Sequence, residues 1–138
     1  MRHDESFGVI PLSKKNGTWH VFLIQHRRSG YWGFPKGHAE ASETPKEAGF
    51  RELKEETNLE LEKLLQEEPI MEQYYFSMEG TRVFKKVLYF IAEVKGKPHL
   101  QSQEIYDGKW FAYPDALQQV THQEGKTLLA QVGKLLQI

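Results

Sequence analysis

One segment constrains the fold more than any other, because the sequence marks both ends of a helix in it. Thr44, Pro45 and Glu47 form a capping box, with Thr at the N-cap, Pro at the first helical position and Glu at the third. Asn58 tolerates the left-handed conformation that closes many helices. We therefore predict a helix that begins at Pro45 and ends at about Thr57.

The segments on either side of this helix have the composition of β-strands. Apolar, β-branched and aromatic residues predict five strands, at Ser6–Leu12, Trp19–Gln25, Gln73–Ser77, Val83–Val94 and Gly108–Ala112. Asn16-Gly17 is a strong hairpin signal and should join the first two strands. A loop rich in Gly and aromatic residues follows at 29–37, and a connector rich in Glu and Leu follows the helix.

A second helix is predicted at the C-terminal end of the chain. Thr121 and Glu124 have capping-box spacing, and an apolar stripe follows at helical period, at Leu128, Leu129, Val132, Leu135 and Leu136. The order is thus strands, helix, strands, helix. This order favours an α+β fold, in which a mixed sheet carries helices on its faces as an α/β/α sandwich.

The bulk composition narrows the class of protein. The length of 138 residues and the hydrophobic share of 39% fit a single domain over residues 1–138 with one real core. The net charge of −1 gives no global field toward nucleic acid or membrane, and the absence of Cys excludes thiolate chemistry. Residues 1–7 are polar and lack the apolar run of a secretory signal, so we expect a cytoplasmic protein with no membrane partner.

Three acidic residues of the predicted helix should share one face. Glu52, Glu55 and Glu56 stand at positions i, i+3 and i+4, which place their carboxylates side by side. One turn earlier, the small residues Ala48 and Gly49 are expected to leave open space above them. Phe50, Leu53 and Thr57 fall roughly opposite and are expected to face the core.

Such a cluster needs a neutralising partner, because like charges raise one another's pKa. Arg51 lies four residues from Glu55 and can pair with it, but one Arg does not balance three Glu. A hard divalent cation would, and carboxylate oxygens suit Mg²⁺, with Mn²⁺ as a second possibility. Acidic helix faces are usually just solvated, so the residues around the cluster decide between the two interpretations.

These flanking residues carry a resemblance to a known family. The spacing is Gly37, five residues, Glu43, seven residues, and then Arg51-Glu52-Leu53-Lys54-Glu55-Glu56-Thr57-Asn58-Leu59. It resembles the Nudix box of the Nudix hydrolases at every defined position except Asn58, where Gly is usual. Since Asn accepts the same backbone geometry, this difference concerns a helix cap and not the chemistry.

The resemblance implies both a fold and a set of roles. The fold would be the Nudix-like α/β/α sandwich, and the activity would be magnesium-dependent pyrophosphohydrolysis. Glu52, Glu55 and Glu56 would be metal ligands and Arg51 would orient a carboxylate. Glu43 would join the loop to the helix, and Gly37 would let the backbone turn closely beneath the phosphates.

The residues immediately before the Nudix box narrow the range of possible substrates. Trp32-Gly33-Phe34-Pro35-Lys36-Gly37-His38 is similar to the asymmetrically cleaving diadenosine tetraphosphate hydrolases. Lys36 is expected to bind phosphate as a flexible cation, although an isolated Lys is usually solvated. His38 could donate a hydrogen bond to a phosphate oxygen or simply fill the loop.

Two later segments resemble the same branch. Tyr89, in the strand Val83–Val94, is a candidate for stacking on adenine, although a Tyr in so apolar a strand often belongs to the core. Lys85 and Lys86 could hold distal phosphates. Glu104 would approach the metal from the opposite side, as an extra ligand or as a proton acceptor.

These residues suggest a reaction. The metal would lower the pKa of a water and screen the phosphate charge, and Glu55, Glu56 or Glu104 would take the proton. Lys36 and the pair Arg27–Arg28 would stabilise the leaving group. The resemblance implies a small dinucleoside polyphosphate substrate, cut into ATP and AMP. We expect the protein to act as a monomer.

Three alternatives remain. Removal of pyrophosphate from RNA 5′ ends uses the same chemistry, but such enzymes usually carry Gln-Gly-Gly where this chain has Lys36-Gly37-His38. Hydrolysis of damaged nucleoside triphosphates would need contacts to a guanine edge, which the sequence does not identify. A non-catalytic nucleotide-sensing domain would generally have lost box carboxylates, and this chain keeps all of them.

Overall fold

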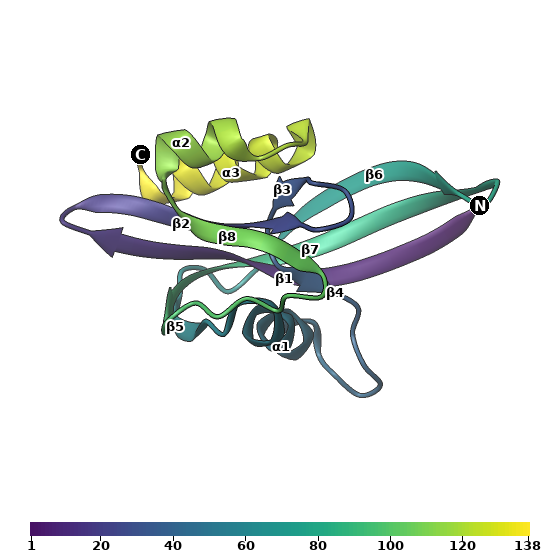
Figure 1. The fold of residues 1–138 in the computed structure, drawn as a ribbon, viewed down its shortest axis with the longest axis horizontal. Helices are drawn as coiled ribbons and strands as arrows, with labels where there is room; N and C mark the ends of the chain where they lie inside the picture. The colour runs from purple at the N-terminus through teal and green to yellow at the C-terminus, as the bar shows by residue number, and fades with distance from the viewer.

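The computed structural model describes all residues, 1–138, as one sheet between two layers of helix (Figure 1). In chain order the elements are β1 (Arg2–Lys15), β2 (Thr18–His26), β3 (Trp32–Gly33), β4 (Lys36–Gly37), α1 (Pro45–Thr57), β5 (Glu60–Leu64), β6 (Ile70–Met78), β7 (Thr81–Lys95), β8 (Ile105–Ala112), α2 (Tyr113–Gln119) and α3 (Gln123–Leu136). No helix is both long and apolar enough to cross a bilayer. The α+β class and the mixed sheet are as predicted.

The mixed character of the sheet comes from one pair of strands. β1 runs parallel to β7 over eleven paired positions, from Arg2↔Val83 to Leu12↔Glu93, and the other pairings are antiparallel. The path of the sheet is β3-β2-β1-β7-β5, with β4 on β1, β6 on β7 and β8 on β2. β1 and β2 meet through the predicted turn, in which Asn16 and Gly17 both have positive φ.

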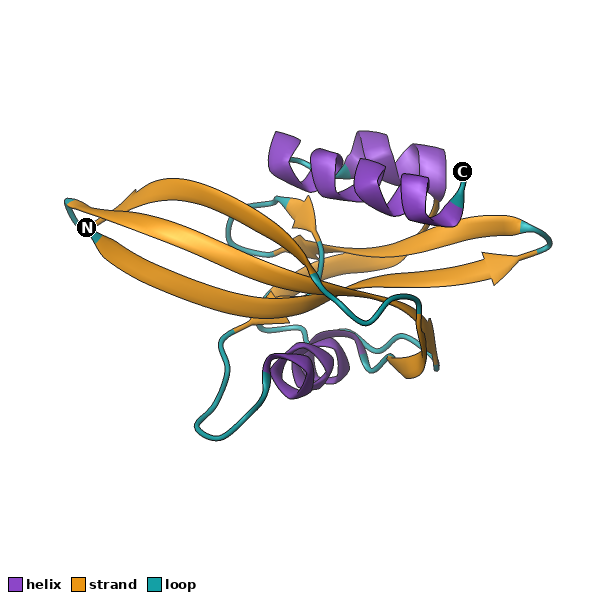
Figure 2. Cartoon of the chain, turned by 180° about the vertical axis from the view of Figure 1, so that it is seen from behind, coloured by secondary structure: helices purple, strands orange, loops and turns teal.

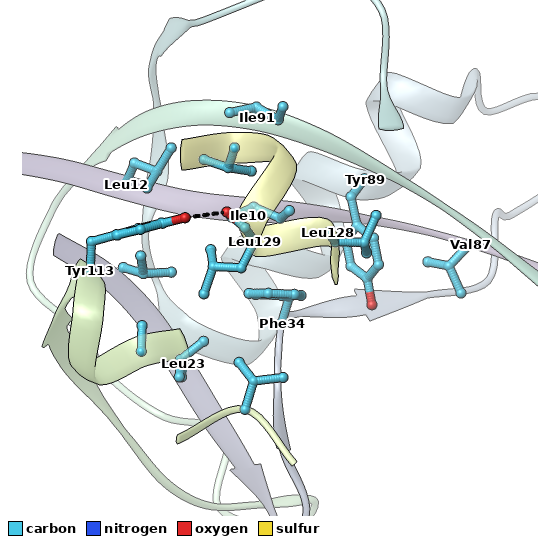
Figure 3. Close-up of a cluster of buried hydrophobic side chains, with 14 residues drawn as sticks. Ile10, Leu12, Leu23, Phe34, Val87, Tyr89, Ile91, Tyr113, Leu128 and Leu129 are labelled. Carbon is cyan, nitrogen blue, oxygen red and sulfur yellow. Dashed lines mark hydrogen bonds between the residues drawn. The ribbon is translucent and has the colours of Figure 1, made fainter. Parts of the chain in front are cut away.

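Each face of the sheet carries its own apolar core. Below the sheet, α1 covers a cluster that includes Val9, Phe22 and Leu53. Above it, α2 and α3 cover a larger cluster that includes Ile10, Leu129 and Tyr113, drawn in Figure 3, where the Tyr113 hydroxyl donates to the Leu129 carbonyl at 2.7 Å. Figure 2 shows the same helices from behind, still on opposite faces.

The helix α1 begins and ends as its sequence predicts. The Thr44 side chain accepts a hydrogen bond from the Glu47 backbone N–H, and the Glu47 side chain accepts one from the Thr44 backbone N–H. Asn58 adopts the left-handed conformation with φ 67° and donates its backbone N–H to Lys54. Leu53 and Thr57 are buried and Phe50 is half-buried, as expected for the core side.

Ala48 and Gly49, the small residues of α1, pack against the sheet. The prediction that they leave open space above the carboxylates was therefore wrong. Ala48 is fully buried, and a methyl group on Gly49 would lie 3.0 Å from the Gly8 carbonyl oxygen of β1. α1 therefore lies unusually close to the central strand. This close approach fixes the height of its carboxylates relative to the sheet.

The capping box predicted for the C-terminal helix was also wrong. α3 begins after His122, which makes no side-chain cap, and the Thr121 hydroxyl instead accepts a hydrogen bond from the Trp32 backbone N–H at 2.8 Å. Thr121 thus joins the start of α3 to the loop before α1. Of the apolar stripe, Leu128, Leu129 and Val132 are buried, whereas Leu135 is exposed.

Several short elements escaped prediction. The Glu- and Leu-rich connector contains β5, the loop at 29–37 contains β3 and β4, and residues 113–119 form α2. β1 also extends well beyond the predicted range of 6–12. Its polar first residues form a strand because they pair in register with β7, a long-range contact that no local pattern reveals.

We predict that Thr44→Ala lowers the free energy of unfolding by about 1 kcal/mol, because it leaves an N-terminal backbone N–H of α1 without its acceptor. Urea denaturation at neutral pH measures the change. Glu124→Gln in α3 is the control and should change stability by less than about 0.5 kcal/mol, since no cap depends on it. Equal losses in the two variants would contradict this account of the caps.

Candidate active site

The carboxylates of α1 open into a polar pocket of about 380 Å³ between the helix and two loops. Most of its lining residues are charged or polar. They are Lys36, Gly37, His38, Ala39, Glu40, Arg51, Glu52, Glu55, Glu56, Gln101 and Glu104. We call this the acidic pocket. All four predicted metal-ligand candidates lie in its wall.

Arg51 organises the acidic side chains. Its Nε and Nη2 donate to the two oxygens of Glu43 at 2.6 and 3.0 Å, and its Nη1 donates to Glu52 at 3.0 Å and to Glu55 at 3.1 Å. Nη2 also donates to the His38 carbonyl oxygen at 2.9 Å, which joins the loop to the helix. The hydrogen bonds from Arg51 hold the pKa of Glu43 below its ordinary value, and Glu43 in turn raises that of Arg51.

Glu56 differs from the other box carboxylates because it makes no ion pair with Arg51. Its side chain is only 6% exposed, and its Oε1 has no hydrogen-bond partner. Burial, together with the charge of Glu52, raises the pKa of Glu56 to about 8, and Lys36 offsets only part of this effect. A buried carboxylate oxygen without a donor is costly unless something outside the chain completes it.

Gly37 makes room for a second carboxylate. A methyl group at position 37 would overlap the carboxylate of Glu52, so only Gly lets the β4 backbone pass this close to α1. Burial raises the pKa of Glu52, although the hydrogen bond from Arg51 works against this. The Gly at this position therefore allows a half-buried carboxylate to stand directly beneath the loop.

Glu104 reaches the acidic pocket on a loop that is tied to the end of α1. The Gln101 backbone N–H donates to the Glu56 carbonyl at 3.1 Å, and the Gln101 side chain accepts from the Glu104 backbone N–H at 2.8 Å. On the other side, the Arg27 backbone N–H donates to the Glu104 carbonyl at 2.8 Å. Glu104 thus lines the acidic pocket from a loop and not from the helix.

A second, larger pocket of about 520 Å³ lies on the α3 side of the sheet. Its lining is rich in aromatic side chains. Five acidic, basic or imidazole side chains also line it. The whole set is His26, Tyr31, Trp32, Gly33, Phe34, Lys36, Glu72, Tyr74, Tyr75, Phe76, Tyr89, Val120, His122, Glu124 and Gly125. We call this the aromatic pocket. Flat aromatic walls of this kind can stack against a nucleobase.

Lys36 is the only residue that lines both pockets. Burial lowers its pKa, and the nearby Lys85 lowers it further, while Glu72 and Glu56 act in the other direction. Its ammonium therefore lies between carboxylates of the two pockets. A ligand with a base in one pocket and phosphates in the other would pass this cation.

Comparison with known proteins identifies the family to which the chain belongs. The model of the NUDIX domain matches residues 2–132. The chain is 31% identical over 131 residues to a Caenorhabditis elegans bis(5'-nucleosyl)-tetraphosphatase [asymmetrical], covering 94% of both chains. The chain belongs to the Nudix family. It is an enzyme of the pyrophosphohydrolase class that this family represents.

Other relatives share the fold or part of the sequence. A crystal structure of a C. elegans Ap4A hydrolase binary complex superposes with a TM-score of 0.76 at 24% identity, covering 97% of this chain and 98% of that one. The NUDIX domain of Shewanella oneidensis NrtR with ADP ribose gives 0.77 at 17% identity, covering 99% and 90%. An RNA pyrophosphohydrolase of Xanthomonas campestris is 31% identical over 76% of this chain and 58% of its own length.

The box carboxylates of this Nudix chain fit a hard divalent cation. No three acidic or imidazole side chains are close enough to form a ligand cage as they stand, because Arg51 holds Glu52 and Glu55. The partnerless Oε1 of Glu56 is the observation that favours a cation. Carboxylate oxygens of this kind suit Mg²⁺ or Mn²⁺.

The other residues predicted to bind phosphate or base lie in different places. His38 lines the acidic pocket with its Nε2 3.0 Å from Asp4 Oδ1, and Tyr89 is a buried wall of the aromatic pocket, edge-on to Phe34. Lys86 enters neither pocket: it lies on the α1 side of β7 and pairs with Glu5 at 2.9 Å.

Arg27 is also absent from both pockets. Its Nε donates to the Ser102 carbonyl at 3.0 Å, and its guanidinium lies 5.2 Å from the centre of the Tyr106 ring. The neighbouring Arg28 is exposed and lines neither pocket. Arg27 thus supports the loop that carries Glu104, which is a different role from the leaving-group contact expected for this pair.

Lys85, which was expected to hold a distal phosphate, lines neither pocket. Lys85 is buried between β1 and β7, where its Nζ donates to Asp4 at 2.7 Å and to Ser6 at 2.6 Å. Burial pushes the pKa of Asp4 upward, but Lys85 and His38 outweigh it and leave the pKa lowered. The aromatic pocket itself was not indicated by the sequence, because its residues come from five separate parts of the chain.

The raised pKa of Glu56 predicts how stability depends on pH in the metal-free protein. Because the folded pKa of about 8 exceeds the ordinary 4.5, ionisation destabilises the fold, and the contribution of the neutral form is lost as pH rises through this range. Without divalent metal, Glu56→Gln should therefore melt higher than the wild type. The gap should open between pH 4.5 and 8 and then stay constant, reaching on the order of 5–10 °C.

Thermal unfolding in a chelating buffer at several pH values measures this gap. Glu62→Gln, on the exposed strand β5, is the matched control and should follow the wild type at every pH. A gap that is the same at pH 4.5 and pH 9 would contradict the assignment of a buried, raised carboxyl at position 56.

Proposed function

We propose that this Nudix chain hydrolyses dinucleoside polyphosphates in a magnesium-dependent reaction and cleaves diadenosine tetraphosphate to ATP and AMP. One observation carries the proposal: Lys36 joins a pocket of carboxylates to a pocket of aromatic rings. Such a pair of pockets suits a ligand with both a polyphosphate and a base. The relative named as an asymmetrical tetraphosphatase, similar over 94% of the chain, supports the same substrate class.

In this proposal, the chain's own groups divide the substrate between them. Tyr89 and its aromatic neighbours hold one adenine, and Lys36 donates to a phosphate oxygen next to it. His38 stands on the far side of the acidic pocket, where its ring is within reach of a more distal phosphate. Gly37 leaves the β4 backbone open to the phosphate chain.

Glu52, Glu55 and Glu56 would hold the magnesium, with Glu104 as a further ligand across the pocket. When bound, the ion supplies charge neutralisation for the polyphosphate and lowers the pKa of a water. Arg51 keeps Glu52 and Glu55 in place through its Nη1. Glu43 holds the opposite edge of that guanidinium, so it acts by positioning and not by contact with substrate.

The chemical step is hydrolysis of a phosphoric anhydride. Water oxygen bonds to one phosphorus of the first P–O–P bridge, that bridge breaks, and the bridging oxygen leaves with the other three phosphates as ATP. A carboxylate of the acidic pocket, Glu55, Glu56 or Glu104, accepts the proton of the water. Lys36 stabilises charge that develops on the phosphate oxygens beside it.

The chain's similarity to an RNA pyrophosphohydrolase makes RNA 5′ ends the second candidate. A panel with Mg²⁺ distinguishes the substrates: diadenosine tetraphosphate, triphosphorylated RNA and nucleoside triphosphates, with products separated by chromatography. We expect diadenosine tetraphosphate to give the highest kcat/KM, with ATP and AMP released in equal amounts. A higher value for RNA, or two molecules of ADP as products, would overturn the proposal.

Glu56→Gln should lower kcat by about 100- to 10,000-fold while the fold survives, because it removes the charge of the most buried ligand candidate. Circular dichroism checks the fold, and a magnesium titration of the residual rate checks the metal. Glu62→Gln serves as control and should keep wild-type turnover. Wild-type turnover in purified Glu56→Gln would contradict the assignment.

A further inference from the structure

The aromatic pocket holds two carboxylates that the proposed hydrolysis does not use. Glu72 projects from β6, next to Tyr74, and Glu124 comes from the first turn of α3 on the opposite side. Aromatic rings make up most of the remaining wall. A carboxylate in such a setting is a hydrogen-bond acceptor beside a surface that suits a flat ring.

Of these two carboxylates, Glu72 is the stronger candidate for a contact with a ligand. It is half-buried, and burial is the largest influence on its pKa, which lies above the ordinary value. Lys36 lowers the pKa of Glu72 through its charge and Glu124 raises it, but neither makes a hydrogen bond or ion pair with it. Its acceptor capacity is therefore unused within the chain, and a bound donor would stabilise it.

The walls beside Glu72 fit a nucleobase edge. Tyr74 and Tyr89 lie on the same face of the sheet as Glu72, since Ile70 pairs with Tyr89 and alternate residues of β6 point to this side. A base stacked on these rings would present its rim toward the strand. Of the groups on a purine rim, an amino group donates hydrogen bonds and a carbonyl oxygen only accepts them.

We propose that Glu72 is a specificity-determining residue that accepts a hydrogen bond from the 6-amino group of an adenine in the aromatic pocket. Hypoxanthine carries a carbonyl oxygen at that position, which would face the carboxylate with no proton between them. The pocket therefore selects adenine over hypoxanthine. This inference rests on the proposed function for its choice of adenine, and it adds the residue that recognises the base.

A simpler role for Glu72 would be to balance the charge of Lys36. That role depends on phosphate and not on the base, so it predicts the same change for every nucleotide when Glu72 is replaced. Base recognition predicts a change confined to bases with the amino group. The comparison of AMP with IMP separates these two roles, because the two nucleotides share the ribose phosphate and differ only on one edge of the base, where IMP has a 6-carbonyl in place of the 6-amino group and a proton on N1.

The test is calorimetric titration of the protein with AMP, IMP and GMP in a chelating buffer, so that it does not depend on turnover. The wild type should bind AMP about 10- to 100-fold more tightly than IMP, as one hydrogen bond to a charged group provides. Glu72→Gln should reduce this preference to about 3-fold or less, because an amide presents a donor as readily as an acceptor. Glu62→Gln should keep the wild-type ratio.

Glu72→Asp is a second variant, which withdraws the carboxylate by one methylene and keeps its charge. It should reduce the AMP preference while leaving the interaction with Lys36 largely in place. Equal weakening of AMP and IMP in Glu72→Gln would assign Glu72 to Lys36 and overturn the inference. So would tighter binding of GMP than of AMP by the wild type, since guanine lacks the 6-amino group.

Hydrolysis of diadenosine and diinosine tetraphosphates with Mg²⁺ then separates this inference from the proposed function. If both are cleaved and Glu72→Gln leaves their kcat/KM ratio unchanged, the function stands and the role of Glu72 fails. If neither is cleaved but the binding preference for AMP depends on Glu72, the base contact stands and only the proposed substrate fails.

Discussion

The guanidinium of Arg51 is the contact on which the acidic pocket depends. Without a cation among them, the carboxylates of Glu43, Glu52 and Glu55 would repel one another and favour a looser loop. Arg51 satisfies all three and also donates to the backbone of the preceding loop, so the loop and helix form one unit. The remaining carboxylate, Glu56, makes no hydrogen bond with Arg51, and its Oε1 has no partner within the chain.

The position of this unit relative to the sheet comes from two glycines and one lysine. Gly49 lets α1 rest against Gly8, and Gly37 lets β4 pass over Glu52. β4 then delivers Lys36 to the boundary between the acidic and aromatic pockets. Packing, and not any single strong interaction, therefore sets the distance between the carboxylates of one layer and the rings of the other.

Local signals were enough to predict α1, the first hairpin and the α+β class, because caps and turns depend on neighbouring residues. The carboxylates of α1 and their meeting with Glu104 could also be anticipated from spacing and resemblance. The short strands β3–β5, the helix α2 and the true length of β1 depend on distant partners. For the same reason Glu72 escaped notice: nothing near it in the sequence distinguishes it from a solvated acid.

The parallel pairing of β1 with β7 has a consequence for how the chain folds. Asp4 and Lys85 are 81 positions apart, yet their ion pair lies at the base of the two central strands. During synthesis, the edge of β1 that pairs with β7 therefore stays unpaired until more than half of the chain has emerged. Such non-local pairing slows folding and exposes the nascent edge to other chains, a vulnerability that polar residues at the start of β1 help to limit.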